Sequence, residues 1–341
     1  MSEPSMRRSP EFDLIAAIRE RLGDPADSGV DVRIGIGDDA AVTVAADGSA
    51  RAVTVDALVD GVGFRRAWCP PRAIGHKAAA AALSDLAAMG AEPTELYAWL
   101  GVPDDLDRDA TLELCDGLAE VGARAGAALL GGDLTASGVL AVSVTAIGRA
   151  AAGERLVGRA GARVGDAVCV TGTLGAAAAG LVLLEHPELA ASVPGAEADG
   201  ARGRQLRPEP RTAAGRALAA AGAGAMIDVS DGLGGDAEHL AAASGVGIEI
   251  ELDRVPLGAG VAAVAAAAGR DPVELAAAGG EDYELLCAIP RAHLEAGREA
   301  VAASGTALTE IGRVEPGAAV RLRLPGGRSV RAAGHDHLRR P

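Results

Sequence analysis

The sequence predicts an α/β protein of the mixed (α+β) kind, organised in two domains. Val- and Ile-rich segments alternate with Ala-rich segments of helical pattern in both halves of the chain. An irregular Gly/Arg-rich stretch, AAGERLVGRAGARVGD, interrupts this alternation near residue 150. A length of 341 residues is also typical of about two domains. We therefore expect a loose, disordered tail over residues 1–10 and domains over 11–150 and 151–341.

The N-terminal half is expected to begin with an amphipathic helix that ends at Gly23. The pattern that follows alternates strands with helices, and Gly90 stops the longer Ala-rich helix. Strands are expected over 30–45, 50–61, 94–103 and 139–149, a strand and turn over 128–137, and helices over 11–23, 72–89 and 107–127.

The C-terminal half opens on DAVCVTGTLGAAAAGLVLL, which is typical of a strand, a glycine loop and a helix. A polar Pro/Gly-rich loop is expected over 192–212. Further strands are expected over 225–230, 247–253 and 283–290, and further helices over 213–221, 232–245, 261–268 and 294–303.

The composition excludes several classes of function. A net charge of −15 opposes binding to nucleic acid or to an anionic membrane surface, both of which need a basic footprint. The N-terminus lacks the apolar core of a signal peptide, and no segment holds the ~20 bulky apolar residues of a membrane span. The four cysteines are far apart and form no zinc or redox motif. We expect a soluble cytoplasmic protein with reduced thiols.

Acidic residues recur inside apolar segments, each beside small Gly or Ala residues. Any one of them could simply form a turn or cap a helix. Their repetition instead favours a cation site, because clustered carboxylates in apolar surroundings need positive charge. No His or Cys accompanies them, so hard, oxygen-seeking Mg²⁺ is a better candidate than zinc. These acids are Asp38, Asp39, Asp56, Asp85, Asp133, Asp228, Asp231, Glu281 and Asp282.

Other signatures of nucleotide binding and of catalysis are missing. Lys77 is the only lysine, and its context GHKAAA is not a P-loop. The motifs of protein kinases are absent, and VTGTLGAAAAG lacks the GxGxxG pattern of dinucleotide-binding turns. No Ser-His-Asp or Cys-His arrangement is present, and the six histidines are expected to be structural or surface groups. The residues alone therefore indicate neither a P-loop nor a nucleophilic triad.

Nine segments, in their order along the chain, resemble those of the thiamine-monophosphate kinase family. That family belongs to the superfamily of aminoimidazole ribonucleotide synthetase and selenophosphate synthetase. The resemblance implies an N-terminal mixed sheet that forms a β-barrel at a homodimer interface, and a C-terminal α/β domain. It also implies that ATP and thiamine monophosphate give ADP and thiamine diphosphate. The segments are GIGDDAAV, VDALVDGVGF, HKAAAAALSDLAAMGAEP, GGDLTAS, GRAGARVGD, VTGTLGAAAAGL, LRPEPR, IDVSDGL and GGEDYELL.

The resemblance also implies roles for individual residues. Asp39 is expected to bind metal directly, and Asp38 to serve a nearby backbone group or a metal-bound water. Lys77 is not expected to be catalytic. The implied Mg²⁺ ligands are Asp39, Thr54, Asp56, Asp85, Asp133, Asp228 and Asp231; the implied ATP contacts are Gly132, Asp133, Arg159 and Ser230; and the implied acceptor contact is Glu281. Two positions depart from the family on the acceptor side: Gly63 stands where a His is usual, and His335 where an aromatic residue is usual.

The implied chemistry agrees with this inventory. The acceptor is a phosphate monoester whose oxygen is already anionic, so transfer needs no proton removal. The main obstacle is repulsion between two phosphorylated reactants, which Mg²⁺ ions bridging aspartates and phosphates offset during direct in-line transfer. Three alternatives stay open: a kinase of the same fold with another phosphorylated acceptor, a non-catalytic paralogue that binds nucleotide or thiamine phosphate, and a Mg²⁺-dependent phosphatase.

Overall fold

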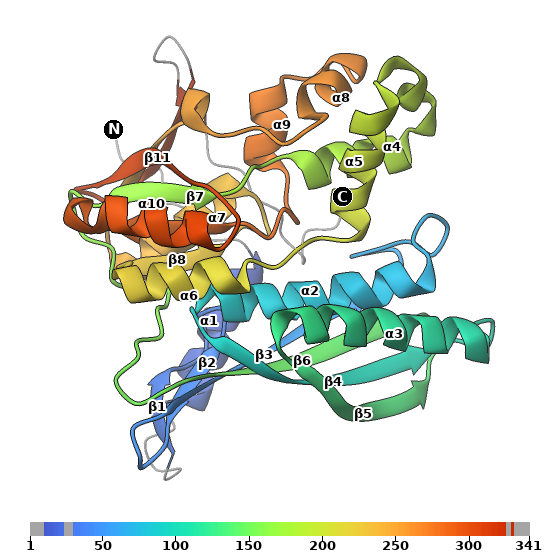
Figure 1. Cartoon of the computed structure of the whole chain (residues 1–341), viewed down its shortest axis with the longest axis horizontal. Helices are drawn as coiled ribbons and strands as arrows, with labels where there is room; N and C mark the ends of the chain where they lie inside the picture. Colours follow the sequence, from blue (N-terminus) through green and yellow to red (C-terminus); the bar gives the residue numbers. More distant parts are fainter. Residues whose placement is uncertain (1–9, 24–29, 325–328, 331–341) are drawn as a thin grey trace.

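The computed structural model describes residues 10–23, 30–324 and 329–330, which form two mixed sheets with helices packed against them (Figure 1). This confirms the predicted two-domain α/β fold. Within the described residues neither sheet closes on itself, so the dimer-interface barrel stays a prediction. The domain boundary near residue 150 also stays a prediction. The predicted tail lies outside the described residues except for Pro10, where helix α1 (Pro10–Leu22) begins.

The first sheet has six strands in the order β1-β2-β3-β6-β4-β5. All neighbours are antiparallel except β4 and β5, which run parallel and are joined by helix α3 (Arg108–Ala125). One face of this sheet packs against helix α2 (Pro71–Ala88), and α3 packs beside α2 (Figure 1). The strands are β1 Asp31–Ile34, β2 Ala41–Val44, β3 Ala50–Val59, β4 Glu92–Val102, β5 Ala128–Ala136 and β6 Ala141–Ala150.

Helix α2 lies at the centre of the molecule, between the first sheet and the C-terminal domain (Figure 1). Its Ala-rich sequence lets neighbouring backbones come very close. A Cβ atom on Gly75 would lie 1.9 Å from the carbonyl oxygen of Leu114 in α3. On the other side, a Cβ on Gly215 of helix α6 (Thr212–Ala221) would lie 1.9 Å from the carbonyl oxygen of Ala87. These approaches fix α2 between the domains, where its side chains can serve both.

The second sheet has seven strands in the order β13-β12-β9-β11-β7-β10-β8. Every residue of β7, β8 and β10 is buried, because helices cover both faces of this sheet. The strands are β7 Ala167–Thr171, β8 Ala225–Asp228, β9 Gly247–Glu251, β10 Leu285–Ile289, β11 Leu308–Glu315, β12 Val320–Arg323 and β13 Ser329–Val330. The remaining helices are α4 Ala176–Glu185, α5 Gly195–Leu206, α7 Leu233–Ser244, α8 Val261–Ala267, α9 Pro272–Ala278, α10 Leu294–Ala303 and the short 3₁₀ helices η2 Pro187–Ser192, η3 Leu252–Arg254 and η4 Arg291–His293.

Most predicted elements are confirmed within a few residues, but two predictions are wrong. The strand expected over 30–45 is a hairpin of β1 and β2, and its connecting loop carries Asp38 and Asp39. The loop expected over 192–212 contains helix α5, because Ala198 and Ala201 are buried against α4 despite the glycines around them. Helix α9 and strands β11 and β12 were not predicted.

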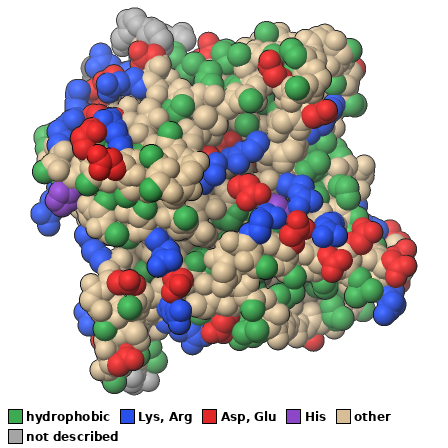
Figure 2. Space-filling model, viewed as in Figure 1, with side chains coloured by type: hydrophobic (Ala, Val, Ile, Leu, Met, Phe, Trp, Pro, Cys, Tyr) green, Lys and Arg blue, Asp and Glu red, His purple; other side chains and the backbone are tan. Residues whose placement is uncertain are grey.

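Charged side chains of both signs are interspersed over the face shown in Figure 2, and many follow the border between the upper and lower parts of this view. Ion pairs join the two domains: Glu120 of α3 pairs with Arg207, which follows α5, at 3.4 Å. Glu120 also contacts Arg72 at 3.1 Å and Arg124 at 3.4 Å. In the described part of the chain, no helix combines the length and apolar character needed to cross a bilayer.

Candidate active site

A cavity of about 920 Å³ lies between the two domains. Its lining comes from the β1–β2 loop, β3 and α2 on one side, and from the loops after β8 and α9 on the other. Acidic side chains concentrate at one end. The polar lining residues include Asp38, Asp39, Thr54, Asp56, Lys77, Asp85, Arg159, Gln205, Asp228, Ser230, Asp231 and Glu281.

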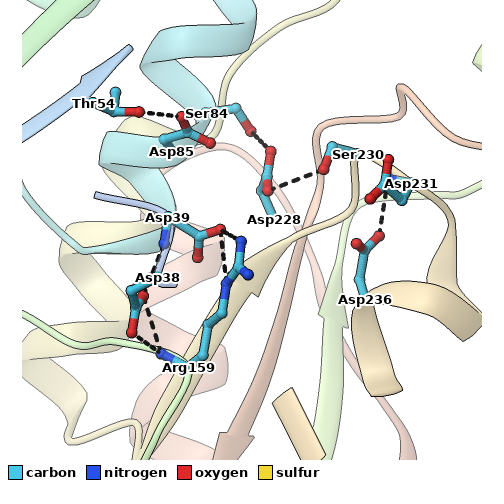
Figure 3. Close-up of polar contacts among 10 residues, drawn as sticks. All are labelled: Asp38, Asp39, Thr54, Ser84, Asp85, Arg159, Asp228, Ser230, Asp231 and Asp236. Atoms are coloured by element: carbon cyan, nitrogen blue, oxygen red, sulfur yellow. Dashed lines mark hydrogen bonds and ion pairs between the residues drawn. The ribbon is translucent and has the colours of Figure 1, made fainter. Parts of the chain in front are cut away.

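Three carboxylates from three separate elements meet in this cavity (Figure 3). Asp39 comes from the β1–β2 loop, Asp85 from α2 and Asp228 from the end of β8, and one oxygen of each lies within 4.8 Å of the others. Thr54 donates a 2.5 Å hydrogen bond to Asp85, and Ser84 donates a 2.7 Å hydrogen bond to Asp228. Hydroxyl groups of neighbouring residues therefore hold two of the three carboxylates in place.

Asp38 and Arg159 fix the third carboxylate. The side chain of Asp38 accepts hydrogen bonds from the backbone N–H groups of Asp39, at 3.0 Å, and of Arg159, at 3.1 Å. The guanidinium of Arg159 donates to Oδ1 of Asp39 at 2.5 Å. The other oxygen of Asp39, Oδ2, is buried and has no hydrogen-bond partner among the described residues. A buried carboxylate oxygen without a partner is costly, so this atom is suited to bind a cation.

A bound cation would lower the electrostatic cost of ionising this cluster. Burial raises the pKa of Asp228 to about 7, and the nearby Asp39 adds to the effect. Burial also raises the pKa of Asp85 well above its usual range, followed by the charges of Asp228 and Asp39. Two full charges 4.8 Å apart repel by about 3 kcal/mol at an effective dielectric constant of about 20. An all-carboxylate donor set with one unpaired oxygen fits a hard divalent cation such as Mg²⁺.

The loop after β8 is held by an acid that the sequence analysis missed. Asp236 accepts the backbone N–H groups of Asp231, at 3.2 Å, and of Gly232, at 3.0 Å, and so fixes this loop at the start of α7. Ser230 lies 3.4 Å from Oδ1 of Asp228. Burial raises the pKa of Asp236 well above its usual range, with Asp231 adding to the effect. The position of Asp236 in the first turn of the predicted helix was the signal that could have identified it as a capping residue.

Glu281 lies next to the loop after β8, since its backbone N–H donates to the carbonyl oxygen of Ser230 at 2.8 Å, and its side chain makes contacts that the sequence analysis also missed. Its carboxylate forms an ion pair with the ammonium of Lys77 at 2.7 Å. It also accepts a hydrogen bond from the side-chain amide of Gln205 at 2.5 Å. Its backbone has a φ of 65°, a left-handed conformation that is unusual outside glycine. Lys77 also donates to the carbonyl oxygen of Gly63 at 2.9 Å. The sequence did contain a signal that Lys77 faces the same cavity as Asp85, because residues eight apart lie on roughly the same face of a helix.

The other acids of the GGEDYELL segment support the fold. Asp282 accepts the backbone N–H groups of Gly175, at 2.6 Å, and of Ala177, at 3.1 Å, and so caps the start of α4. Burial raises the pKa of Asp282 to about 7. Glu284 is fully buried and pairs with Arg211 at 2.6 Å. Only the first acid of the segment, Glu281, lines the cavity.

Of the residues singled out from the sequence, twelve line the cavity: Asp38, Asp39, Thr54, Asp56, Gly63, Lys77, Asp85, Arg159, Asp228, Ser230, Asp231 and Glu281. Gly132 and Asp133 do not. They lie on the exposed edge strand β5, where Asp133 is in register with Trp99 of β4. His335 lies outside the described residues.

Comparison with known proteins places this chain in a family. The family model described as AIR synthase related protein, N-terminal domain, matches residues 37–150, and the corresponding C-terminal domain model matches residues 163–325. A relative from Mycobacterium tuberculosis named thiamine-monophosphate kinase is 38% identical over 291 residues, covering 83% of this chain and 81% of the relative. The chain belongs to the thiamine-monophosphate kinase family.

Other members of the thiamine-monophosphate kinase family match along most of their length. A Caulobacter vibrioides protein of that name is 38% identical, covering 95% of this chain and 89% of the relative. A solved structure of AaThiL complexed with AMPPCP and TMP superposes with a TM-score of 0.82 at 34% identity, and the match covers 97% of this chain and 99% of that one. The family predicted from the sequence segments is therefore confirmed.

Proposed function

We propose that this chain transfers the γ-phosphoryl group of ATP to thiamine monophosphate, giving thiamine diphosphate and ADP. The observation that carries the proposal is the meeting of Asp39, Asp85 and Asp228 within 4.8 Å in a cavity that Glu281 also lines. Relatives named thiamine-monophosphate kinase, and a structure of AaThiL complexed with an ATP analogue and TMP, support the choice of substrates.

We propose that the acidic end of the cavity holds Mg²⁺. The unpaired Oδ2 of Asp39 and the raised pKa values of Asp85 and Asp228 support this. Bound there, Mg²⁺ would offset the charge of the phosphate groups and polarise the transferred one. The proposed ligands from this chain are Asp39, Thr54, Asp56, Asp85, Asp228 and Asp231.

The chain's own residues then have distinct tasks. Arg159 supplies the positive charge nearest to Asp39, and together with Ser230 it is the proposed contact for ATP. Asp38 holds the β1–β2 loop against the backbone of Arg159, so the metal-binding loop and the ATP-binding residue move together. Glu281 is the proposed contact for the acceptor. No side chain has to remove a proton, because the attacking phosphate oxygen is already anionic.

We further propose a homodimer in which the first sheets of two copies form a barrel. By strand register, Asp133 shares a face with Trp99 and Val55, opposite to the face on which Thr54 and Asp56 meet the cavity. That outer face leaves Val55 65% and Trp99 39% exposed. Asp133 is not among the described carboxylates that meet in the cavity of its own chain, and we propose that it and Gly132 complete the site of the partner copy.

We also propose that the protein is cytoplasmic and that its two domains meet near residue 150. The four cysteines are free in the structure, which suits a reducing compartment. The strands of the first sheet end at Ala150 and those of the second begin at Ala167. The intervening segment carries Arg159 into the site between the two sheets.

The test is a single incubation of purified protein with ATP, MgCl₂ and thiamine monophosphate, followed by anion-exchange chromatography. We expect equal amounts of thiamine diphosphate and ADP, and no product when MgCl₂ is replaced by EDTA. Free thiamine would instead indicate a phosphatase. ATP binding without turnover would indicate a non-catalytic paralogue, and turnover only with another phosphorylated acceptor would indicate a different kinase.

A further inference from the structure

Lys77 is a buried cation that the proposed chemistry does not use. It is the only lysine in the sequence, and its side chain is 2% exposed. It lies on α2 on the same face as Ala81 and Asp85, and all three line the cavity. Eight residues of helix rise separate Lys77 from Asp85, which is about 12 Å along the axis. Lys77 therefore marks the end of the cavity away from the carboxylate cluster.

The ammonium of Lys77 joins three chain segments. It donates to the carbonyl oxygen of Gly63, in the loop between β3 and α2, at 2.9 Å. It pairs with Glu281, in the loop between α9 and β10, at 2.7 Å. One contact is made within the N-terminal domain and the other reaches the C-terminal domain. Both loops line the cavity, and this side chain bridges them.

Glu281 is held through both its backbone and its side chain. Its backbone lies in the left-handed region, which is unfavourable for a non-glycine residue, and its N–H donates to the carbonyl oxygen of Ser230 at 2.8 Å. Lys77 binds one oxygen of its carboxylate and Gln205 binds the other. The side chain of Glu281 is still 27% exposed, so the fixed carboxylate keeps a face toward the cavity. A carboxylate held in this way can meet a polar or cationic group of a ligand in one defined orientation.

We propose that Lys77 is a positioning residue for the acceptor substrate: it holds Glu281 and the Gly63 loop at the spacing that receives the end of the acceptor remote from its phosphate. This inference rests on the proposed function. Lys77 does not touch the transferred phosphoryl group, because Asp85 lies two helical turns away at the carboxylate cluster. Small Ala81 between them leaves the cavity open for the body of the acceptor.

The test compares the steady-state kinetics of wild type with those of Lys77→Met, which keeps the length of the side chain and removes its charge. We expect the KM for thiamine monophosphate to rise about 10- to 100-fold, as is typical for loss of a charged hydrogen bond, while the KM for ATP stays within about twofold. The control is Arg211→Met, which breaks the buried ion pair with Glu284 outside the cavity. It should lower Tm without raising the KM for the acceptor selectively.

A second variant keeps the proposal testable if Lys77→Met leaves Glu281 unpaired and unfolds the protein. The double variant Lys77→Met/Glu281→Gln has no buried charge at this position, and we expect it to fold. It is compared with Glu281→Gln alone: because Lys77 acts through Glu281, adding Lys77→Met should leave the acceptor KM of Glu281→Gln unchanged within about twofold.

Three outcomes would overturn the proposal. The first is an unchanged acceptor KM in folded Lys77→Met, or an acceptor KM in the double variant well above that of Glu281→Gln alone. The second is an equal rise in the KM for both substrates, which is the mark of a purely structural role. The third is a selective rise in Arg211→Met as well. If wild type itself makes no thiamine diphosphate, the proposed function fails first, and this inference fails with it.

Discussion

Replacing Asp228 with Asn removes one charge from the carboxylate cluster and keeps its shape, so we expect the metal-free protein to become more stable at pH 8. Asp228 is 2% exposed, and burial, followed by the charge of Asp39, raises its pKa from near 4 to about 7. At about 1.4 kcal/mol for each pKa unit, ionising Asp228 costs the folded state about 4 kcal/mol. An Asn side chain can still accept the 2.7 Å hydrogen bond from Ser84.

The pH dependence follows from the direction of the shift. Because the folded-state pKa is raised, the unfolded state releases this proton at lower pH than the folded state does. Wild type therefore loses stability as the pH rises from about 4 to about 7, and the loss is complete above that range. Asp228→Asn should raise the free energy of unfolding by about 2 kcal/mol at pH 5 and by about 4 kcal/mol at pH 8. The latter corresponds to a rise in Tm of several degrees.

The assay is thermal unfolding of wild type and Asp228→Asn between pH 5 and pH 8, with EDTA and then with MgCl₂. With MgCl₂ at pH 8 we expect wild type to gain Tm and the variant to gain much less. The control is Asp282→Asn, whose carboxylate is also buried with a pKa raised to about 7 but caps α4 outside the cavity. It should keep the response to MgCl₂. A variant less stable than wild type at pH 8, or a difference independent of pH, would refute the reasoning.

Three further predictions concern the rest of the site. Asp85→Asn should abolish turnover and the Tm gain with MgCl₂ while leaving far-UV circular dichroism unchanged; activity near that of wild type would reject its role as a ligand. Gly63→His should lower the KM for thiamine monophosphate several-fold by adding about 1 kcal/mol of polar contact at the acceptor end. The new Cβ lies 2.7 Å from only the flexible end of Leu58, and an unchanged KM would count against this placement. Mixing inactive Asp133→Asn with inactive Asp85→Asn should restore about a quarter of wild-type activity if subunits exchange freely in a dimer; no recovery would contradict a shared site.

The sequence predicted the elements whose pattern is set locally. The Ala-rich run before Gly90 is helix α2, and the β-branched run around Thr54 is strand β3. Helix α5 was missed because its glycines mask a buried stripe of Ala198 and Ala201, and only packing against α4 decides that segment. The hairpin between β1 and β2 was missed because the residues around Asp38 continue an apolar run, while the turn there depends on contacts with Arg159.

The site was predictable where an acid interrupts an apolar element, as Asp85 and Asp228 do. It was not predictable where a residue acts through a partner distant in sequence. Lys77 meets Glu281 only after the two domains pack, and nothing in the context GHKAAA indicates that contact. For Asp133 the sequence pointed the other way. Its segment suggested a metal ligand, but strand register places it on the outer face of the sheet.

The central claim is that acids from both domains hold divalent cations between two phosphorylated substrates. A crystal structure with Mn²⁺, a non-hydrolysable ATP analogue and thiamine monophosphate tests it directly through the anomalous signal of manganese. We predict manganese peaks bonded to Asp39, Asp85 and Asp228 and shared with oxygens of the nucleotide phosphates. A fully occupied nucleotide with no manganese at these carboxylates would contradict the claim.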